Sequence, residues 1–166
     1  MDMMNQVKTT ILLTLMTLVV LFTAQTLGYN LIFSLFFAGI FNFLIYFYSG
    51  KIALSSTRAK KIEEDEYDDV RGIVKFLIQK EQMPMPSLYI IENDQPNAFA
   101  TGRNPKNASI AVTTGILKVL NKDELEGVLA HEISHIKNRD ILVSSMAAML
   151  ASTISFMSRS VLWGGG

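Results

Sequence analysis

Residues 124–140 read ELEGVLAHEISHIKNRD, and this stretch carries the most specific pattern in the chain. Just before it, Asn121 and Glu124 have the spacing of a capping box, in which two side chains satisfy the free N–H groups at the start of a helix. The apolar residues that follow recur at helical spacing. The pattern therefore predicts a helix that begins at Asn121 and continues to about Asn138.

His131, Glu132 and His135 form the pattern H-E-x-x-H on this predicted helix. Residues i and i+4 share one face of a helix, so both imidazoles can reach one zinc ion. Glu132 is not a ligand in such a site, because its carboxylate takes a proton from the water that attacks a peptide carbonyl. With two His and eight Glu in 166 residues, coincidence produces the pattern about once in 1,700 chains. We therefore expect a zinc hydrolase site rather than two unrelated helix histidines.

Catalytic zinc normally has three protein ligands and a water. The chain has no further His and no Cys, and residues 141–166 contain no Asp or Glu. The third ligand is then an upstream carboxylate, Asp140, or a residue outside this chain. On a continuous helix Asp140 would be rotated about 500° from His135, some 140° away from the ligand face. We expect Asp140 to support the site by a hydrogen bond instead.

Charge is distributed very unevenly along the chain. Residues 3–50 contain one charged side chain, Lys8, whereas residues 51–140 contain 27 of the 30. Residues 9–27 and 31–48 are uncharged, apolar and close to the ~20 residues that a membrane-spanning helix needs. The sequence predicts a hairpin of two spans, and the second apolar run follows too soon for the first to be a cleaved signal peptide.

Orientation of the hairpin follows from its basic residues. Lysine and arginine occur before the first span and after the second, and the turn at residues 28–30 has none. Because cytoplasmic loops carry an excess of Lys and Arg, both outer ends should be cytoplasmic. A third apolar run begins after Asp140, where we expect a further span or a helix that lies in the membrane.

The polar middle of the chain predicts a small α+β domain. Residues 59–83 contain the apolar spacing of an amphipathic helix, with the acidic residues 63–69 in its first turns. Short β-branched runs predict strands of a small mixed or antiparallel sheet at residues 87–92 and 108–114, with residues 97–101 between them. Residues 102–107 have the composition of a turn.

Composition excludes several function classes. The chain has 15 basic and 15 acidic residues, so its net charge of zero provides no general attraction to nucleic acid, and we expect no nucleic-acid partner. It contains no cysteine. Disulfides, zinc–thiolate sites, iron–sulfur clusters and cysteine nucleophiles are therefore excluded.

The order of these features resembles the HtpX family of membrane-bound zinc metalloproteases. Two membrane spans precede MPMPSLYIIENDQPNAFATGRNPKNASIAVTTGIL, residues 83–117, and the metal motif and a further apolar run follow. HEISHIKNRD alone is moderately specific, whereas NAFATGRNPKNASIAVTTG at residues 97–115 makes the resemblance strong. It covers essentially the whole chain.

The resemblance implies a transmembrane hairpin over residues 1–50, a partial zincin-like protease domain over residues 51–140, and a third transmembrane or membrane-associated helix over residues 141–166. The implied activity is that of an ATP-independent zinc endopeptidase that cleaves unfolded or membrane proteins in quality control and the stress response. The implied location is the prokaryotic inner membrane, where a multi-pass protein holds its protease domain in the cytoplasm.

The resemblance also assigns roles to individual residues. It makes His131 and His135 the zinc ligands and Glu132 the general base, and it places Asn97 and Ala98 in a strand that holds substrate. An exposed strand can pair with an extended peptide and present its scissile bond to the metal. The alternative is that Asn97 only opens a turn. The sequence does not indicate which strand lies at the sheet edge.

Family members continue to a glutamate that completes the zinc site. By the resemblance, this chain is a C-terminally truncated member that lacks the third ligand, so we expect it to be inactive by itself. Another interpretation is a membrane scaffold or partner-binding protein with a vestigial metal site. A third is a protease of prenylated CAAX peptides, which should have more spans before its catalytic helix.

Overall fold

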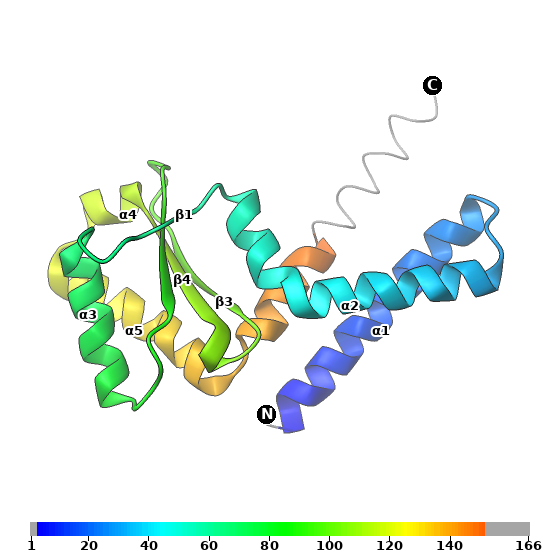
Figure 1. The fold of residues 1–166 in the computed structure, drawn as a ribbon, viewed down its shortest axis with the longest axis horizontal. Helices are drawn as coiled ribbons and strands as arrows, with labels where there is room; N and C mark the ends of the chain where they lie inside the picture. The colour runs from blue at the N-terminus through cyan, green and yellow to red at the C-terminus, as the bar shows by residue number, and fades with distance from the viewer. Residues whose placement is uncertain (1–2, 152–166) are drawn as a thin grey trace. The chain divides into compact units, whose positions relative to one another are not determined.

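The computed structural model describes residues 3–151. The chain divides into two compact units, of which the first combines Met1–Ser49 with Val143–Gly166 and the second is Gly50–Leu142. Figure 1 shows the elements of each unit along the chain.

The first unit is built on two long apolar helices, α1 (Met3–Thr26) and α2 (Leu31–Ser56), and the last residues of α2, from Gly50, belong to the second unit. Both helices are long and apolar enough to cross a membrane. Gly28 adopts φ 81°, and the Asn30 side chain accepts a hydrogen bond from the Phe33 N–H at 2.9 Å, which starts α2. These observations confirm the predicted pair of helices and the turn between them.

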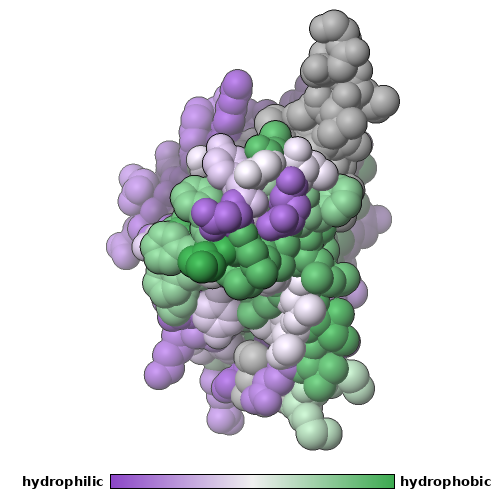
Figure 2. All heavy atoms as spheres, turned by 90° about the vertical axis from the view of Figure 1, so that its right-hand side faces the viewer, coloured by the Kyte–Doolittle hydropathy of each residue, from purple (hydrophilic) through white to green (hydrophobic). Residues whose placement is uncertain are grey.

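The surface of this hairpin is largely apolar. Ile32 is 82% exposed and Phe22 is 72% exposed, and Figure 2 shows hydrophobic residues over much of the end of this unit. Inside the hairpin, Asn42 Nδ2 donates to Thr17 Oγ1 at 2.6 Å, which joins α2 to α1. A polar contact of this kind holds two apolar helices together where hydrophobic burial does not.

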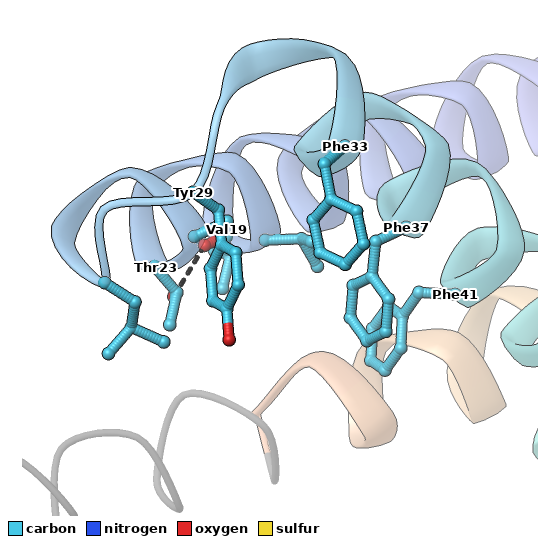
Figure 3. A pocket seen from close by; sticks show the side chains of 9 residues that line it. Val19, Thr23, Tyr29, Phe33, Phe37 and Phe41 are labelled. Atoms are coloured by element: carbon cyan, nitrogen blue, oxygen red, sulfur yellow. Dashed lines mark hydrogen bonds between the residues drawn. The ribbon is translucent and has the colours of Figure 1, made fainter.

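An apolar pocket of about 370 Å³ opens between the helices near their turn (Figure 3). Aromatic residues spaced along one side of α2 line it, namely Phe33, Phe37 and Phe41, and Tyr29 stacks on Phe33 with ring centroids 5.2 Å apart. Thr23 donates to the Val19 carbonyl at 2.8 Å, so its hydroxyl is satisfied within α1. The pocket therefore presents almost only hydrocarbon.

The second unit contains a mixed sheet. Its strands are β1 (Lys60–Lys61), β2 (Ser87–Ile91), β3 (Ala98–Gly102) and β4 (Ala108–Thr113), in the order β1-β2-β4-β3. β2 and β4 are parallel, and the other two pairs are antiparallel. The sheet confirms the predicted α+β class, and it places β3 at an edge.

Three helices accompany the sheet, α3 (Asp68–Lys80), α4 (Thr114–Val119) and α5 (Lys122–Asn138). The helices α3 and α5 lie on one face of the sheet (Figure 1). Their apolar side chains and those of the sheet form one core. The other face carries a smaller cluster of Leu54, Ile91 and Ala111, in which the last turns of α2 contact the sheet.

The start of α3 differs from the prediction. Lys60 and Lys61 pair with β2, and the buried Ile62 donates its N–H to the Leu88 carbonyl at 2.9 Å, so the chain is extended just before the acidic run. Of the acidic run, only Asp68 and Asp69 lie in the first turn. The helix therefore begins at Asp68, later than predicted, and its apolar spacing is as expected.

The connection from β3 to β4 is the predicted turn, with a 3-10 helix at Pro105–Asn107. Gly102 adopts φ 135°, and a Cβ there would lie 2.2 Å from the Asn107 carbonyl oxygen. Glycine is therefore required for the tight return of β3 into β4. After α5, the described part of the third apolar run is the helix Ile141–Ala151. The rest of that prediction, residues 152–166, lies outside the described residues.

Candidate active site

The helix α5 positions the candidate site, and its start is the predicted capping box. Asn121 Oδ1 accepts from the Glu124 N–H at 3.0 Å, and Glu124 Oε2 accepts from the Asn121 N–H at 2.9 Å. The buried face of α5 carries Leu125, Leu129, Ile133 and Ile136. This apolar stripe sets the rotation of the helix on the sheet, and it leaves His131, Glu132 and His135 outside the core.

His131 and His135 lie one turn apart on α5 with their Nε2 atoms 3.2 Å from each other. Their rings are nearly perpendicular, at 85°. Two nitrogen ligands of a tetrahedral zinc ion, each at about 2.0–2.1 Å, lie about 3.3–3.4 Å apart. The separation of the two imidazole nitrogens therefore fits a shared zinc ion.

Asp140 contacts the far side of the His135 ring. Both carboxylate oxygens lie 3.1 Å from His135 Nδ1. The helix ends at Asn138, and Arg139 adopts φ 58°, which turns the chain back toward the histidine. When Nδ1 carries the proton and donates it to Asp140, Nε2 keeps its lone pair for a metal. This is the arrangement expected of a supporting residue rather than a ligand.

Glu132 points toward the edge strand. Its Oε2 accepts a hydrogen bond from the Ala100 backbone N–H at 2.8 Å. The carboxylate is half-buried, and the contact fixes it beside the two histidines on the same helix. Sequence reasoning missed Ala100, since the residue acts through its backbone and no side-chain pattern marks it.

The free edge of β3 faces the same region. The Thr113 backbone N–H donates to the Asn97 carbonyl at 3.0 Å, so the Asn97 carbonyl points toward β4. Pairs alternate along an antiparallel ladder, so Ala98 and Ala100 direct their backbone N–H and C=O groups away from β4. The donation from Ala100 to Glu132 agrees with this pattern. Within the described residues, the outward backbone groups of Ala98 therefore have no partner, and they lie on the same edge as the Ala100 N–H that reaches Glu132.

The structure thus brings His131, Glu132, His135 and Asp140 together, with Ala98 on the neighbouring strand edge. Asn97 is exposed and lies one residue before β3. Its backbone N–H is bonded to Thr113 Oγ1 at 2.9 Å. Within residues 3–151, no group of three His, Cys, Asp or Glu side chains is arranged to hold a metal ion.

Comparison with known proteins identifies the family. The sequence model of peptidase family M48 matches residues 64–165, which include β2, β3, β4 and α5. The chain belongs to peptidase family M48. The resemblance to HtpX proteins is confirmed as well, because curated relatives across nearly the whole chain carry that name.

Three of these relatives are each named a protease HtpX homolog. The protein of Thermodesulfovibrio yellowstonii is 44% identical over 162 residues, which are 96% of this chain and 57% of its own length. That of Thermococcus sibiricus is 46% identical over 164 residues, 96% of this chain and 56% of its own. That of Aquifex aeolicus is 46% identical over 134 residues, 81% of this chain and 44% of its own. The chain spans about half the length of these relatives.

Proposed function

We propose that the protein is a zinc-dependent endopeptidase anchored in a membrane, and that His131 and His135 are two of its zinc ligands. The observation that carries this proposal is the 3.2 Å separation of the two Nε2 atoms, with the Glu132 carboxylate held beside them on the same helix. Membership of a peptidase family supports hydrolysis of peptide bonds as the reaction.

Each residue then has a chemical role. Glu132 takes the proton of the attacking water and returns it to the leaving amine. Asp140 holds the His135 ring so that its Nε2 faces the other histidine. When bound, zinc would supply Lewis acidity that polarises the scissile carbonyl and lowers the pKa of the water. A third protein ligand completes such sites, and we place it outside residues 3–151.

The substrate in this proposal is an extended peptide that pairs with the free edge of β3. Ala98 offers an unpaired N–H and C=O there, and Asn97 lies at the start of the same edge. Backbone pairing requires an extended or unfolded segment and no particular sequence. It therefore supports misfolded or membrane proteins as substrates, and a role in protein quality control.

Membrane anchoring rests on the first unit. Two helices long enough to span a bilayer expose most of their large apolar side chains, and the pocket lined by Phe33, Phe37 and Phe41 is nearly all hydrocarbon (Figure 3). Exposure of these apolar surfaces to water is strongly unfavourable, and contact with lipid avoids that exposure. The basic residues favour a multi-pass inner-membrane protein whose protease unit faces the cytoplasm.

The proposal is tested on the full-length protein with casein cleavage and zinc content measured on the same preparations. Glu132→Gln should retain zinc and lose roughly 10²–10⁴-fold in cleavage rate, because the amide cannot accept the proton. His131→Ala or His135→Ala should lose zinc and activity together. Glu126→Gln, on the same helix, is the matched control and should behave as wild type.

Two results would contradict the proposal. Near-normal cleavage by the Glu132→Gln protein would exclude Glu132 as the general base. Zinc content unaffected by both histidine variants, with no cleavage by the wild type, would instead indicate a scaffold protein with a vestigial site.

A further inference from the structure

A pocket of about 280 Å³ lies beside β3 in the second unit, and both polar and apolar residues line it. Its walls come from the residues that follow α2, including Thr57 and Arg58, and from Asn97 and Phe99 at the edge strand. Phe99 packs with the cluster of Leu54, Ile91 and Ala111, whereas Ala98 and Ala100 pack against the core that contains α5. Since side chains alternate along a strand, the pocket opens on the face of the sheet opposite the candidate catalytic helix.

Arg58 is the one charged residue among those that line this pocket in the described part of the chain. Its side chain is exposed, and within residues 3–151 its guanidinium has no hydrogen bond or ion pair. Two acidic residues, Glu92 and Asp94, are neighbours in sequence of residues that line the pocket. Each already forms an ion pair, Glu92 with Lys60 at 2.6 Å and Asp94 with Lys118 at 2.7 Å. Among the described residues, the pocket therefore carries a positive charge that no acidic side chain compensates, surrounded by uncharged residues.

The backbone keeps Arg58 at this place. The residue adopts φ 54°, in the left-handed region, and the following Ala59 donates its N–H to the Leu54 carbonyl at 3.0 Å. Glycine is the usual residue in this position after a helix, because other residues have a steric cost there. The left-handed turn thus fixes the place where the Arg58 side chain leaves the backbone.

A peptide paired with the free edge of β3 would present its side chains to both faces of the sheet in turn. Those opposite Ala98 and Ala100 would lie toward α5 and the zinc ligands. Those opposite Asn97 and Phe99 would lie toward the pocket. An arginine binds a carboxylate through two parallel hydrogen bonds, which makes an acidic side chain the ligand that matches the pocket.

We propose that this pocket is a substrate subsite that binds the side chain of a glutamate or aspartate through Arg58, and so gives the protease a preference for an acidic residue near the scissile bond. This inference rests on the proposed peptidase function. It adds a charge-dependent specificity to backbone pairing, which by itself does not distinguish one sequence from another.

The test measures peptide binding separately from cleavage. Full-length protein with Glu132→Gln is titrated, in neutral detergent without lipid, with fluorescent peptides in which one Glu is moved along an otherwise neutral sequence. At one position, or at two positions separated by one residue, the peptide with Glu should bind roughly 3- to 10-fold more tightly than the same peptide with Gln. Adjacent positions should show no preference, because their side chains face α5.

Variants of the protein then test whether Arg58 causes the preference for Glu. Arg58→Gln should remove it and leave the affinity for the all-neutral peptide unchanged, whereas Arg58→Lys should retain part of it. Lys106→Gln, in the turn between β3 and β4 and outside the pocket, removes one positive charge as a matched control and should retain the full preference. Raising the salt concentration should reduce the preference.

Three outcomes would overturn the inference. They are equal weakening of acidic and neutral peptides by Arg58→Gln, a Glu preference that survives this substitution, and Arg58-dependent binding of a short-chain anionic phospholipid without any Glu preference. Failure of the wild-type protein to cleave any of these peptides, with or without Glu, is a separate result, because it would contradict the proposed function and not the subsite.

Discussion

The Glu132 carboxylate accepts a hydrogen bond of 2.8 Å from the backbone N–H of Ala100. The contact links the helix that carries both histidines to the edge strand of the sheet. It uses an N–H that points away from β4, so it does not compete with the sheet ladder. A backbone group thus sets the orientation of the proposed general base.

Substitution of Ala100 by proline should lower kcat and leave KM nearly unchanged. Proline fixes φ and removes the N–H that reaches Glu132, but it leaves the hydrogen bonds to β4 in place. It is tolerated on an edge strand where the missing N–H faces outward. Hydrogen bonds to charged groups contribute about 1.5–3 kcal/mol, so the expected loss is roughly 10- to 100-fold.

Ala98→Pro is the matched control, since it removes an outward N–H that does not contact Glu132. It should raise KM for extended peptides with a smaller effect on kcat. Steady-state kinetics on both variants, with circular dichroism to verify folding, distinguishes the two. A folded Ala100→Pro protein with wild-type kcat would show that the contact does not orient Glu132.

Substitution of Asp140 by alanine should weaken zinc binding roughly 10- to 100-fold, because partners of ligand histidines fix their tautomer and ring orientation. Chelator competition on the full-length protein measures the affinity. Asp123→Asn, in the exposed first turn of α5, is the charge-matched control and should bind zinc normally. An unchanged affinity for Asp140→Ala would remove Asp140 from the proposed site.

Loss of the Asn121 cap should destabilise the second unit. Asn121→Ala leaves the Glu124 N–H without its acceptor, and such substitutions typically cost about 1 kcal/mol. Thermal unfolding of the full-length protein in detergent should show a lower Tm. Asn121→Asp retains a side-chain acceptor and should unfold near the wild-type temperature, and equal losses in both variants would contradict a capping role.

The proposed membrane topology predicts opposite labelling of two single cysteines. The chain has no native cysteine, so the background is clean. A cysteine at Asn30, in the turn of the hairpin, should react with an impermeant thiol reagent only from outside the cell. A cysteine at Ser56 should react only after the membrane is opened. The reverse pattern would show that the hairpin has the opposite orientation.

Local sequence was sufficient for α5 and for the placement of its histidines. A capping box and the i, i+4 spacing depend on the geometry of a single helix, which is the same in every fold. The same holds for the two apolar helices of the first unit, because their length and composition need no partner to be interpreted. His131 and His135 could therefore be paired before any tertiary contact was known.

Strand order and the contacts across it required the tertiary structure. β4 pairs in parallel with β2 and antiparallel with β3. The sequences of these three strands do not indicate which of them lies at the edge of the sheet. The strand Lys60–Lys61 could not be predicted for the same reason, since its partner β2 is distant in sequence. Ala100 reaches Glu132 through an N–H that every residue except proline has, so only the position of β3 beside α5 gives it that role.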